Sequence, residues 1–452
     1  MQLQFLGATD TVTGSKYLVQ HDKTKVLVDC GLFQGYKLLR LRNWTPLPVN
    51  PAAIDAVILT HAHIDHSGYL PLLVRQGFHG KVYCTPATLD LCRILLPDCG
   101  HLLEEEAEFA NRHKISKHTP ALPLYTRHDA ERCLSLFHSV VYDKNWQPAP
   151  GLHASLAPSG HMPGSSFVRL DNGSRSILFS GDIGRPNDMV LTAPSVVDGA
   201  DYLVVESTYG DRLHQSSDVL LELANVINRT AARGGVLVIP AFAVGRAQSL
   251  LYCIHLLKAR GVIHNLPVYL NSPMAASAMQ VYLKHRAELR LTAAQCEAMA
   301  LTAHVVETPE ESRLLNARRG PMVIIAASGM ATGGRVVHHL KAFAPDKRNT
   351  ILFAGFQAGG TRGATIASGA PTVRIHGEDI PVRAEVAMLN HLSAHADAAE
   401  IISWLSGFKF PPKQTFITHG EPAAADAMRQ RIERELHWSC HMPGYLESVT
   451  LT

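Results

Sequence analysis

A short apolar stretch is followed within six residues by three histidines and an aspartate, His61, His63, Asp65 and His66, in the segment ILTHAHIDHSG (58–68). His61 and His63 are two residues apart, so they point to one side of an extended turn. Imidazole nitrogens and carboxylate oxygens are ligands that suit zinc. A lone histidine near a strand end is most often an ordinary surface or core residue. Four such groups buried together need a compensating charge, so the segment predicts a metal site.

Several other short apolar stretches also end in a polar turn. They are KVLVDCG ending at Asp29, SILFSGDIG at Asp182, YLVVESTYG at Glu206 and TFITHGE at His419. Each is rich in Val, Ile, Leu or Phe, which is typical of a buried strand. Layered α/β proteins place their chemistry just beyond the carboxyl ends of strands. The pattern therefore predicts an α/β protein whose strand ends share one site.

Ligand-type residues at these turns complete a predicted site for two metal ions. His161 in APSGHMPGS adds a nitrogen, and the carboxylate of Asp182 can bridge two cations. The seven predicted ligands are His61, His63, Asp65, His66, His161, Asp182 and His419. Asp29 is expected to orient a ligand histidine from outside this set, although a solvated turn carboxylate explains it equally well.

The middle of the chain has a different pattern. Four apolar runs, in GVLVIPAFAVGR, LPVYLNSPMA, PMVIIAASGMATGG and NTILFAGFQAGGTRG, each lead into a turn with Gly, Ser or Pro. Residues 220–234 and 247–261 show helical apolar spacing and end in glycine. Strands alternating with helices predict an open parallel α/β sheet. We therefore predict that residues 208–385 are inserted into a domain made of residues 1–207 and 386–452.

Composition narrows the function classes. The chain of 452 residues is too long for one ordinary core, and its 46% hydrophobic and 18% charged residues indicate a globular protein. A formal net charge of +3 is no general polyanion-binding signature, so a nucleic acid would need a local basic cleft. Eight cysteines without a CxxC pair, no signal-peptide pattern and no membrane-length apolar run predict a cytoplasmic protein.

Further motifs show that the chain resembles a known family. The turns ESTYG, LSAHAD and THGE carry Glu206, His395 and His419. With Asp29, HAHIDH (61–66), His161 and Asp182, they resemble the motifs of the metallo-β-lactamase superfamily and, within it, of the β-CASP nucleases, which include RNA-processing enzymes. The phrases AFAVGRAQ, SGMATGGR and IHGEDIPVRAEV match as well. NSPMA matches with one departure, because aspartate is expected at Asn271.

The resemblance implies the fold and the activity. It implies a metallo-β-lactamase αββα sandwich carrying an inserted parallel α/β β-CASP domain. It also implies a zinc-dependent ribonuclease with two Zn²⁺ per chain that acts on single-stranded RNA, because histidine at the position of His419 accompanies RNA substrates in this family, whereas DNA-acting members tend to have valine. Mn²⁺ or Fe²⁺ in place of zinc, and a homodimer, stay open.

The family also implies a role for each site residue. His61, His63 and His161 would hold one zinc, Asp65, His66 and His419 the other, and Asp182 would bridge them. A hydroxide held by both ions would attack phosphorus in line. The predicted catalytic residues are Asp65, His395 and Glu206. His395 would protonate the leaving 3′-oxygen, and Glu206 would orient it and raise its pKa. From the residues alone, His395 is nearly as well explained as a helix N-terminal residue.

A cleft between the two domains is expected to hold the RNA strand. The predicted phosphate contacts are Arg246, Ser328, Gly329, Arg335 and Arg362. Ser328 and Gly329 precede a predicted helix and could offer backbone N–H groups to a phosphate. The three arginines each follow a predicted strand and could reach phosphates. A single arginine is more often an ordinary surface residue, so these are the least constrained assignments.

Two other function classes fit parts of the sequence. A hydrolase of a small thioester or lactone would use the same metals, but it would need neither residues 208–385 nor His395. A non-catalytic RNA-binding scaffold would need no complete ligand set, and every ligand position is filled here. Cleavage assays on RNA, DNA and a thioester, with and without a chelator, separate the three classes.

Overall fold

The computed structural model describes residues 1–214, 218–263, 265–355, 357–389 and 392–452, which form two compact units. Unit 1 comprises Met1–Asp188, Thr192–Leu213 and His395–Thr452, and unit 2 comprises Met189–Leu191 and His214–Ala394. The chain therefore leaves unit 1, builds unit 2 and returns to unit 1. The domain limits drawn from the sequence, at 207/208 and 385/386, stay a prediction.

Unit 1 contains two sheets of seven strands each among the described residues. In spatial order, the first sheet contains β22 (Ser448–Thr450), β1 (Gln2–Phe5), β2 (Tyr17–His21), β3 (Thr24–Val28), β4 (Ala56–Ile58), β5 (Lys81–Cys84) and β6 (Phe137–Ser139). The second contains β21 (Cys440–His441), β20 (Gln414–Thr418), β11 (Tyr202–Glu206), β10 (Ser176–Phe179), β9 (Ser166–Asp171), β8 (Leu152–Pro158) and β7 (Trp146–Ala149).

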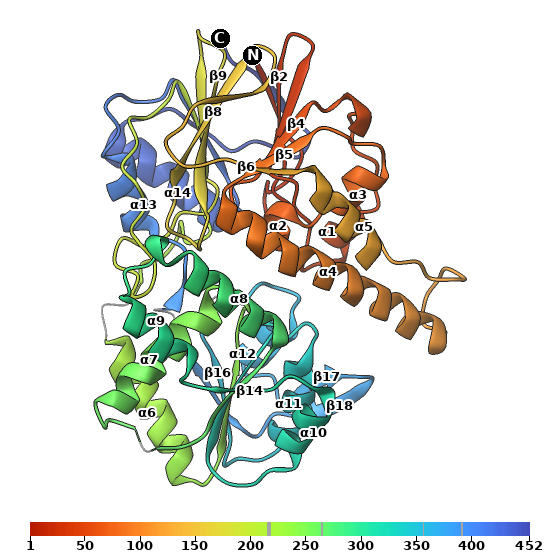
Figure 1. Cartoon of the computed structure of the whole chain (residues 1–452), viewed down its shortest axis with the longest axis vertical. Helices are drawn as coiled ribbons and strands as arrows, with labels where there is room; N and C mark the ends of the chain where they lie inside the picture. The colour runs from red at the N-terminus through yellow and green to blue at the C-terminus, as the bar shows by residue number, and fades with distance from the viewer. Residues whose placement is uncertain (215–217, 264, 356, 390–391) are drawn as a thin grey trace. The chain divides into compact units, whose positions relative to one another are not determined.

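Unit 1 also contains helices. They are α1 (Lys37–Arg42), α2 (Ile64–Ser67), α3 (Leu70–Arg75), α4 (Pro86–Arg112), α5 (Arg127–Cys133), α13 (Ala398–Leu405) and α14 (Pro422–Leu436), with short 3-10 helices at Pro51–Ala53 and Leu134–Leu136. In Figure 1, α13 and α14 lie on the side of the second sheet, and α3, α4 and α5 lie on the side of the first.

The two sheets of unit 1 pack face to face around one apolar core. Ile177 and Phe179 of β10 belong to this core together with Val28 and Ile58 of the first sheet, whereas Leu178 packs with α13 and α14 on the opposite face. This alternation is the two-residue period of a strand that is buried on both faces. The predicted αββα sandwich is confirmed.

Unit 2 is built on a parallel sheet. Its strands, in spatial order, are β14 (His304–Val305), β13 (Val268–Asn271), β15 (Met322–Ala326), β12 (Val236–Pro240), β16 (Thr350–Phe353) and β19 (Glu385–Met388), and every neighbouring pair is parallel. The strands β17 (Thr372–Ile375) and β18 (Glu378–Pro381) form a separate hairpin. The predicted open parallel sheet of the inserted segment is confirmed.

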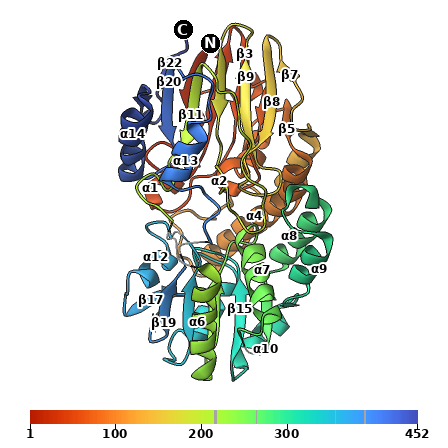
Figure 2. The ribbon, with the colours of Figure 1, turned by 90° about the vertical axis from the view of Figure 1, so that its left-hand side faces the viewer.

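Helices lie on both faces of the unit 2 sheet, as Figure 2 shows for α6 and α7 on one face. They are α6 (Val219–Ala232), α7 (Arg246–Ala259), α8 (Pro273–Lys284), α9 (Ala293–Ala300), α10 (Pro309–Ala317), α11 (Arg335–Phe343) and α12 (Arg362–Ala367), with a 3-10 helix at Arg286–Glu288. The helices predicted at 220–234 and 247–261 correspond to α6 and α7 and are confirmed.

Strand directions in unit 1 bring the predicted ligand loops to common sheet edges. β3 and β4 are parallel, as are β10, β11 and β20, so the loops after each set lie at one edge of their sheet. β8 is antiparallel to β9, which is antiparallel to β10, so the loop after β8 lies at the same edge as the loop after β10.

The loop after β3 lies directly against the loop after β4. Cys30 N donates to His66 O at 2.7 Å, and Leu32 N donates to Ile64 O at 2.9 Å. A Cβ added to Gly31 would lie 1.5 Å from the carbonyl oxygen of Asp65. Any side chain at this position therefore forces apart two backbone segments, one of which carries predicted metal ligands.

Replacing Gly31 with alanine is expected to lower the free energy of unfolding by about 3 kcal/mol, because the added methyl group meets backbone atoms that cannot rotate away. Guanidinium unfolding followed by circular dichroism measures the change. Gly444→Ala is the matched control in unit 1, since its nearest contact is Glu447 Oε2 at 3.6 Å, and it should shift stability by no more than about 0.5 kcal/mol. Equal stability of the two variants would contradict this account.

Candidate metal centre

Seven side chains from four separate loops of unit 1 converge at the strand ends. His61, His63, Asp65 and His66 lie between β4 and the end of α2, and His161 lies between β8 and β9. Asp182 follows β10, and His419 follows β20. All seven predicted ligands belong to unit 1. Their donor atoms form two groups, each compact enough to hold one metal ion.

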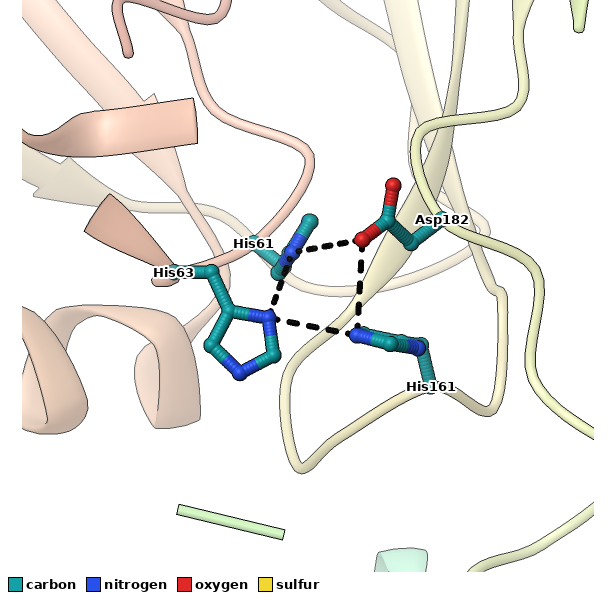
Figure 3. Close-up of side chains that lie close together, drawn as sticks. All are labelled: His61, His63, His161 and Asp182. Atoms are coloured by element: carbon teal, nitrogen blue, oxygen red, sulfur yellow. Dashed lines mark hydrogen bonds and ion pairs between the residues drawn. The ribbon is translucent and has the colours of Figure 1, made fainter. Parts of the chain in front are cut away.

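The first group contains His61, His63, His161 and Asp182, whose ring nitrogens and carboxylate face one point (Figure 3). His63 Nδ1 lies 3.1 Å from His61 Nε2 and 3.2 Å from His161 Nε2. Asp182 Oδ2 lies 3.4 Å from His61 Nε2 and 3.5 Å from His161 Nε2. Donors on a tetrahedral zinc with bonds of 2.0–2.1 Å are about 3.3 Å apart, so this spacing fits a zinc ion.

The second group contains Asp65, His66 and His419. His66 Nε2 lies 3.1 Å from His419 Nε2 and 3.7 Å from Asp65 Oδ2, and His419 Nε2 lies 3.4 Å from Asp65 Oδ2. The other carboxylate oxygen of Asp182, Oδ1, lies 3.2 Å from His66 Nε2. Asp182 therefore presents one oxygen to each group, which is the geometry of a bridging carboxylate.

The donor chemistry of both groups calls for a cation. Asp182 Oδ1 is fully buried and accepts no well-aligned hydrogen bond from the described residues, although His66 Nε2 lies 3.2 Å away. His61 and His161 are buried as well. Buried polar atoms without partners are costly, and two imidazole nitrogens at about 3 Å can share only one proton. Metal ions would satisfy these lone pairs, so the residues present fit zinc.

Burial keeps the imidazoles of His61 and His63 neutral at pH 7. Burial, aided by the neighbouring His66, lowers the pKa of His61 to about 3. Burial also lowers the pKa of His63 to about 4, although Asp65 and Asp182 oppose the effect. A neutral imidazole keeps the lone pair that a metal binds. These two side chains are thus ready to bind a metal at neutral pH without first losing a proton.

Outer partners orient the ligand rings. Asp29 Oδ2 lies 2.7 Å from His66 Nδ1, and Asp29 in turn accepts hydrogen bonds from Thr60 N at 2.8 Å and Thr60 Oγ1 at 2.9 Å. Thr60 Oγ1 lies 3.0 Å from His61 Nδ1, and Thr208 Oγ1 lies 3.0 Å from His419 Nδ1. The sequence pointed to Asp29 but missed both threonines, because a threonine after a strand carries no distinctive signal.

Two of these residues adopt a backbone conformation that is rare outside glycine. Asp29 has φ 58° and His419 has φ 51°. Such left-handed conformations persist only where the surroundings hold them. Here His419 N donates to Ala8 O at 2.7 Å, and Asp29 N donates to Ile58 O at 2.9 Å. The turns are thereby held in shapes that aim both side chains at the second group.

His395 and Glu206 form a pair beside the first group. His395 Nδ1 lies 3.1 Å from Glu206 Oε2, and Glu206 Oε1 also accepts from Ile183 N at 2.6 Å. The opposite nitrogen, His395 Nε2, lies 3.8 Å from Asp182 Oδ2. Burial alone would lower the pKa of His395, but the carboxylates of Glu206 and Asp182 outweigh burial and raise the pKa to about 9.

The predicted phosphate-binding residues belong to unit 2, whereas the predicted metal ligands belong to unit 1. The Arg246 guanidinium is buried and donates to Ala354 O. Arg335 donates to backbone carbonyls of residues 306 and 307, and Arg362 donates to those of residues 332 and 374. Ser328 Oγ accepts from Thr332 N, and Gly329 O accepts from Gln357 Nε2. The arginines thus support loops of unit 2, and their contact with phosphate stays a prediction.

Asn271 is buried in unit 2. Its Nδ2 donates to Ser312 Oγ at 2.7 Å and lies 2.6 Å from His339 Nε2. Its Oδ1 accepts from Arg335 Nη1 at 2.9 Å. An amide at this position therefore serves as donor and acceptor at once, which the expected aspartate, when ionised, could not do.

Comparison with known proteins identifies the family. Three protein-family models match the chain. The one described as metallo-beta-lactamase superfamily matches residues 10–225. The one described as Beta-Casp domain matches residues 247–366, and the one described as Zn-dependent metallo-hydrolase RNA specificity domain matches residues 379–443. The chain is 37% identical to Ribonuclease TTHA0252 of Thermus thermophilus over 93% of both chains. It is 30% identical to transcription termination factor FttA of Methanocaldococcus jannaschii, over 99% of this chain and 71% of that protein.

The chain belongs to the metallo-β-lactamase superfamily and, within it, to the β-CASP family of RNA-processing nucleases. It is a metal-dependent hydrolase of that family. A solved structure, a protein of unknown function from Enterococcus faecalis V583, aligns over 100% of this chain with a TM-score of 0.55 and 12% identity, which supports the fold alone. In the described part of the chain, every helix is too short or too polar to span a membrane.

Replacing Asp182 with asparagine removes a negative charge that both donor groups face. Loss of a residue that only supports a metal ligand weakens metal binding roughly 10–100-fold, and the Asp182→Asn change should weaken zinc binding by more than that. Zinc content after dialysis, measured by mass spectrometry, reports the loss. Asp198→Asn provides the control, since Asp198 is an exposed carboxylate of unit 1 paired with Lys409. Unchanged zinc content in the Asp182 variant would exclude the bridging role.

Proposed function

We propose that the chain is a zinc-dependent ribonuclease that hydrolyses phosphodiester bonds of single-stranded RNA. The match to an RNA specificity domain over residues 379–443 supports RNA as the substrate. The similarity to a ribonuclease over 93% of the chain supports hydrolysis. Both His395 and His419 lie within the segment that matches the RNA specificity domain.

The proposed centre holds two zinc ions. His61, His63 and His161 would hold one ion, and Asp65, His66 and His419 the other, with one oxygen of Asp182 on each. Zinc, when bound, lowers the pKa of a coordinated water and polarises a phosphoryl oxygen. Asp29, Thr60 and Thr208 would hold the ligand rings in their bound orientation, because each contacts a ring nitrogen on the side away from the donor groups.

The observation that carries the proposal is the orientation of His395. Its Nδ1 is tied to Glu206, whose own carboxylate is fixed by the backbone of Ile183. Its Nε2 faces the first donor group, 3.8 Å from Asp182 Oδ2. A protonated imidazole held in this way can donate the Nε2 proton to the leaving 3′-oxygen. Glu206 would act as the positioning residue that keeps the proton-bearing atom aimed at the substrate.

Replacing His395 with alanine is expected to slow RNA cleavage by about 10²–10⁴-fold, the usual contribution of a general acid. Zinc content should stay at two ions per chain, because His395 lies outside both ligand groups. Hydrolysis of bis-p-nitrophenyl phosphate should slow much less in this variant, since its leaving group needs no proton. His153→Ala, at an exposed histidine of unit 1, is the control. Normal RNA cleavage by a zinc-loaded His395→Ala protein would refute the role.

A substrate comparison tests the proposed function as a whole. Purified protein should cleave labelled single-stranded RNA, and removal of zinc by a chelator should abolish cleavage until zinc is restored. Single-stranded DNA and a small thioester should be cleaved at least about 100-fold more slowly. Rapid thioester hydrolysis without RNA cleavage would instead indicate a small-molecule hydrolase, and binding of RNA without any cleavage would indicate a scaffold.

A further inference from the structure

The chain segment that follows Asp29 leads from the metal centre to an exposed surface. We use the name α1 surface for the side chains of Tyr36, Lys37, Leu38, Arg40, Leu41 and Trp44. Its apolar members are strongly exposed, with Tyr36 at 57%, Leu38 at 79%, Leu41 at 50% and Trp44 at 58%. The described residues of α1 include none that is buried. So much apolar area on one short segment marks an interaction site.

The loop that carries the α1 surface is held in place by contacts of Asn43 and Arg42. The buried side chain of Asn43 closes the loop, because its Oδ1 accepts from Phe33 N at 2.9 Å and its Nδ2 donates to Phe33 O at 2.8 Å. The Arg42 guanidinium lies 4.2 Å above the ring of Tyr445 and 5.4 Å above that of Phe33. These contacts fix both ends of the loop, so the exposed side chains are presented in a defined arrangement.

The base of the loop is attached to the metal ligands. Leu32 N donates to the carbonyl of Ile64, which precedes the ligand Asp65. Tyr36 follows Leu32 by four residues, a span of at most about 14 Å. In Figures 1 and 2, α1 lies at the same end of the strands as α2, which carries the ligands. A single-stranded RNA segment of a few nucleotides that starts at the metal centre can therefore reach the α1 surface.

The charge of the loop indicates what covers it. Residues 31–54 contain three basic residues, Lys37, Arg40 and Arg42, and no acidic residue. Among the described residues, neither Lys37 nor Arg40 forms an ion pair. A two-fold contact between the α1 surfaces of two copies would bring these like charges together, because residues 31–54 contain no carboxylate to compensate them. A partner with flat apolar faces and regular negative charges, such as single-stranded nucleic acid, matches both the aromatic and the cationic side chains.

We propose that the α1 surface binds the single-stranded RNA outside the metal centre. Bases stack on Trp44 and Tyr36, and phosphates contact Lys37 and Arg40. The inference rests on the proposed function, because it names the surface that holds the RNA strand in unit 1. It assigns substrate binding to residues that neither the metal-ligand motifs nor the predicted phosphate contacts include.

Cleavage kinetics on RNA of two lengths test the inference with the zinc-loaded protein. For a 16-nucleotide RNA, a Tyr36→Ala/Trp44→Ala variant should raise KM about tenfold or more with a much smaller change in kcat, because lost stacking weakens binding and not the chemical step. For a trinucleotide, which is too short to extend far along the α1 surface, the same variant should raise KM far less. Phe410→Ala is the control, since Phe410 is 46% exposed and precedes β20, at the strand end opposite His419.

A second variant tests the charges. Lys37→Ala/Arg40→Ala should reduce the slope of log kcat/KM against log salt by about 1.4 for the long RNA, the value for two phosphate contacts on a single strand. If the wild-type protein cleaves the long RNA and both variants match it in KM and salt slope, the α1 surface does not bind RNA. If the wild-type protein cleaves no RNA, the proposed function fails, and the inference with it. A fall in sedimentation mass in the Tyr36→Ala/Trp44→Ala variant would overturn the inference in favour of a second copy.

Discussion

The metal centre depends on one buried carboxylate, that of Asp182, which lies among imidazoles from loops far apart in the sequence. Its two oxygens face different donor groups, at 3.4 Å from His61 Nε2 and 3.2 Å from His66 Nε2. Both sheets of unit 1 contribute, because His61 and His66 follow a strand of the first sheet and Asp182 a strand of the second. The packing of the two sheets is therefore what sets the spacing of the donor atoms, and the apolar core beneath them keeps that spacing constant.

Much of this arrangement could be predicted from the sequence. The α/β class and the inserted parallel sheet follow from short apolar strands that end in polar turns and from helices such as those at 220–234 and 247–261. The αββα sandwich was implied by the family resemblance. The metal ligands were accessible because HAHIDH is dense in ligand types, and because parallel strands bring their carboxyl ends to one edge. The strand-end pattern linked Asp182 and His419 to this segment, and the family motifs then pointed to the same residues.

The remaining features depend on contacts between distant residues. Thr60 and Thr208 support ligand rings, yet a threonine near a strand end is too common to stand out. Arg335 and Arg362 each follow a strand and were expected to reach phosphates, but their guanidinium groups donate to backbone carbonyls within unit 2. Which acceptor an arginine finds is decided by tertiary packing. Likewise, the close approach at Gly31 is visible only once two loops, more than thirty residues apart, are seen side by side.

The order of strands in the second sheet has a consequence for biosynthesis. β20 pairs with β11, although unit 2 lies between them in the chain, and only β20 delivers His419 to the second donor group. Ribosomes make a chain from its N-terminus, so a nascent polypeptide carries most of the ligands long before the last one emerges. An unfinished copy of this nuclease thus lacks a complete centre while it is still attached to the messenger RNA that encodes it. The metal centre can therefore be completed only after the whole of unit 2 has been synthesised.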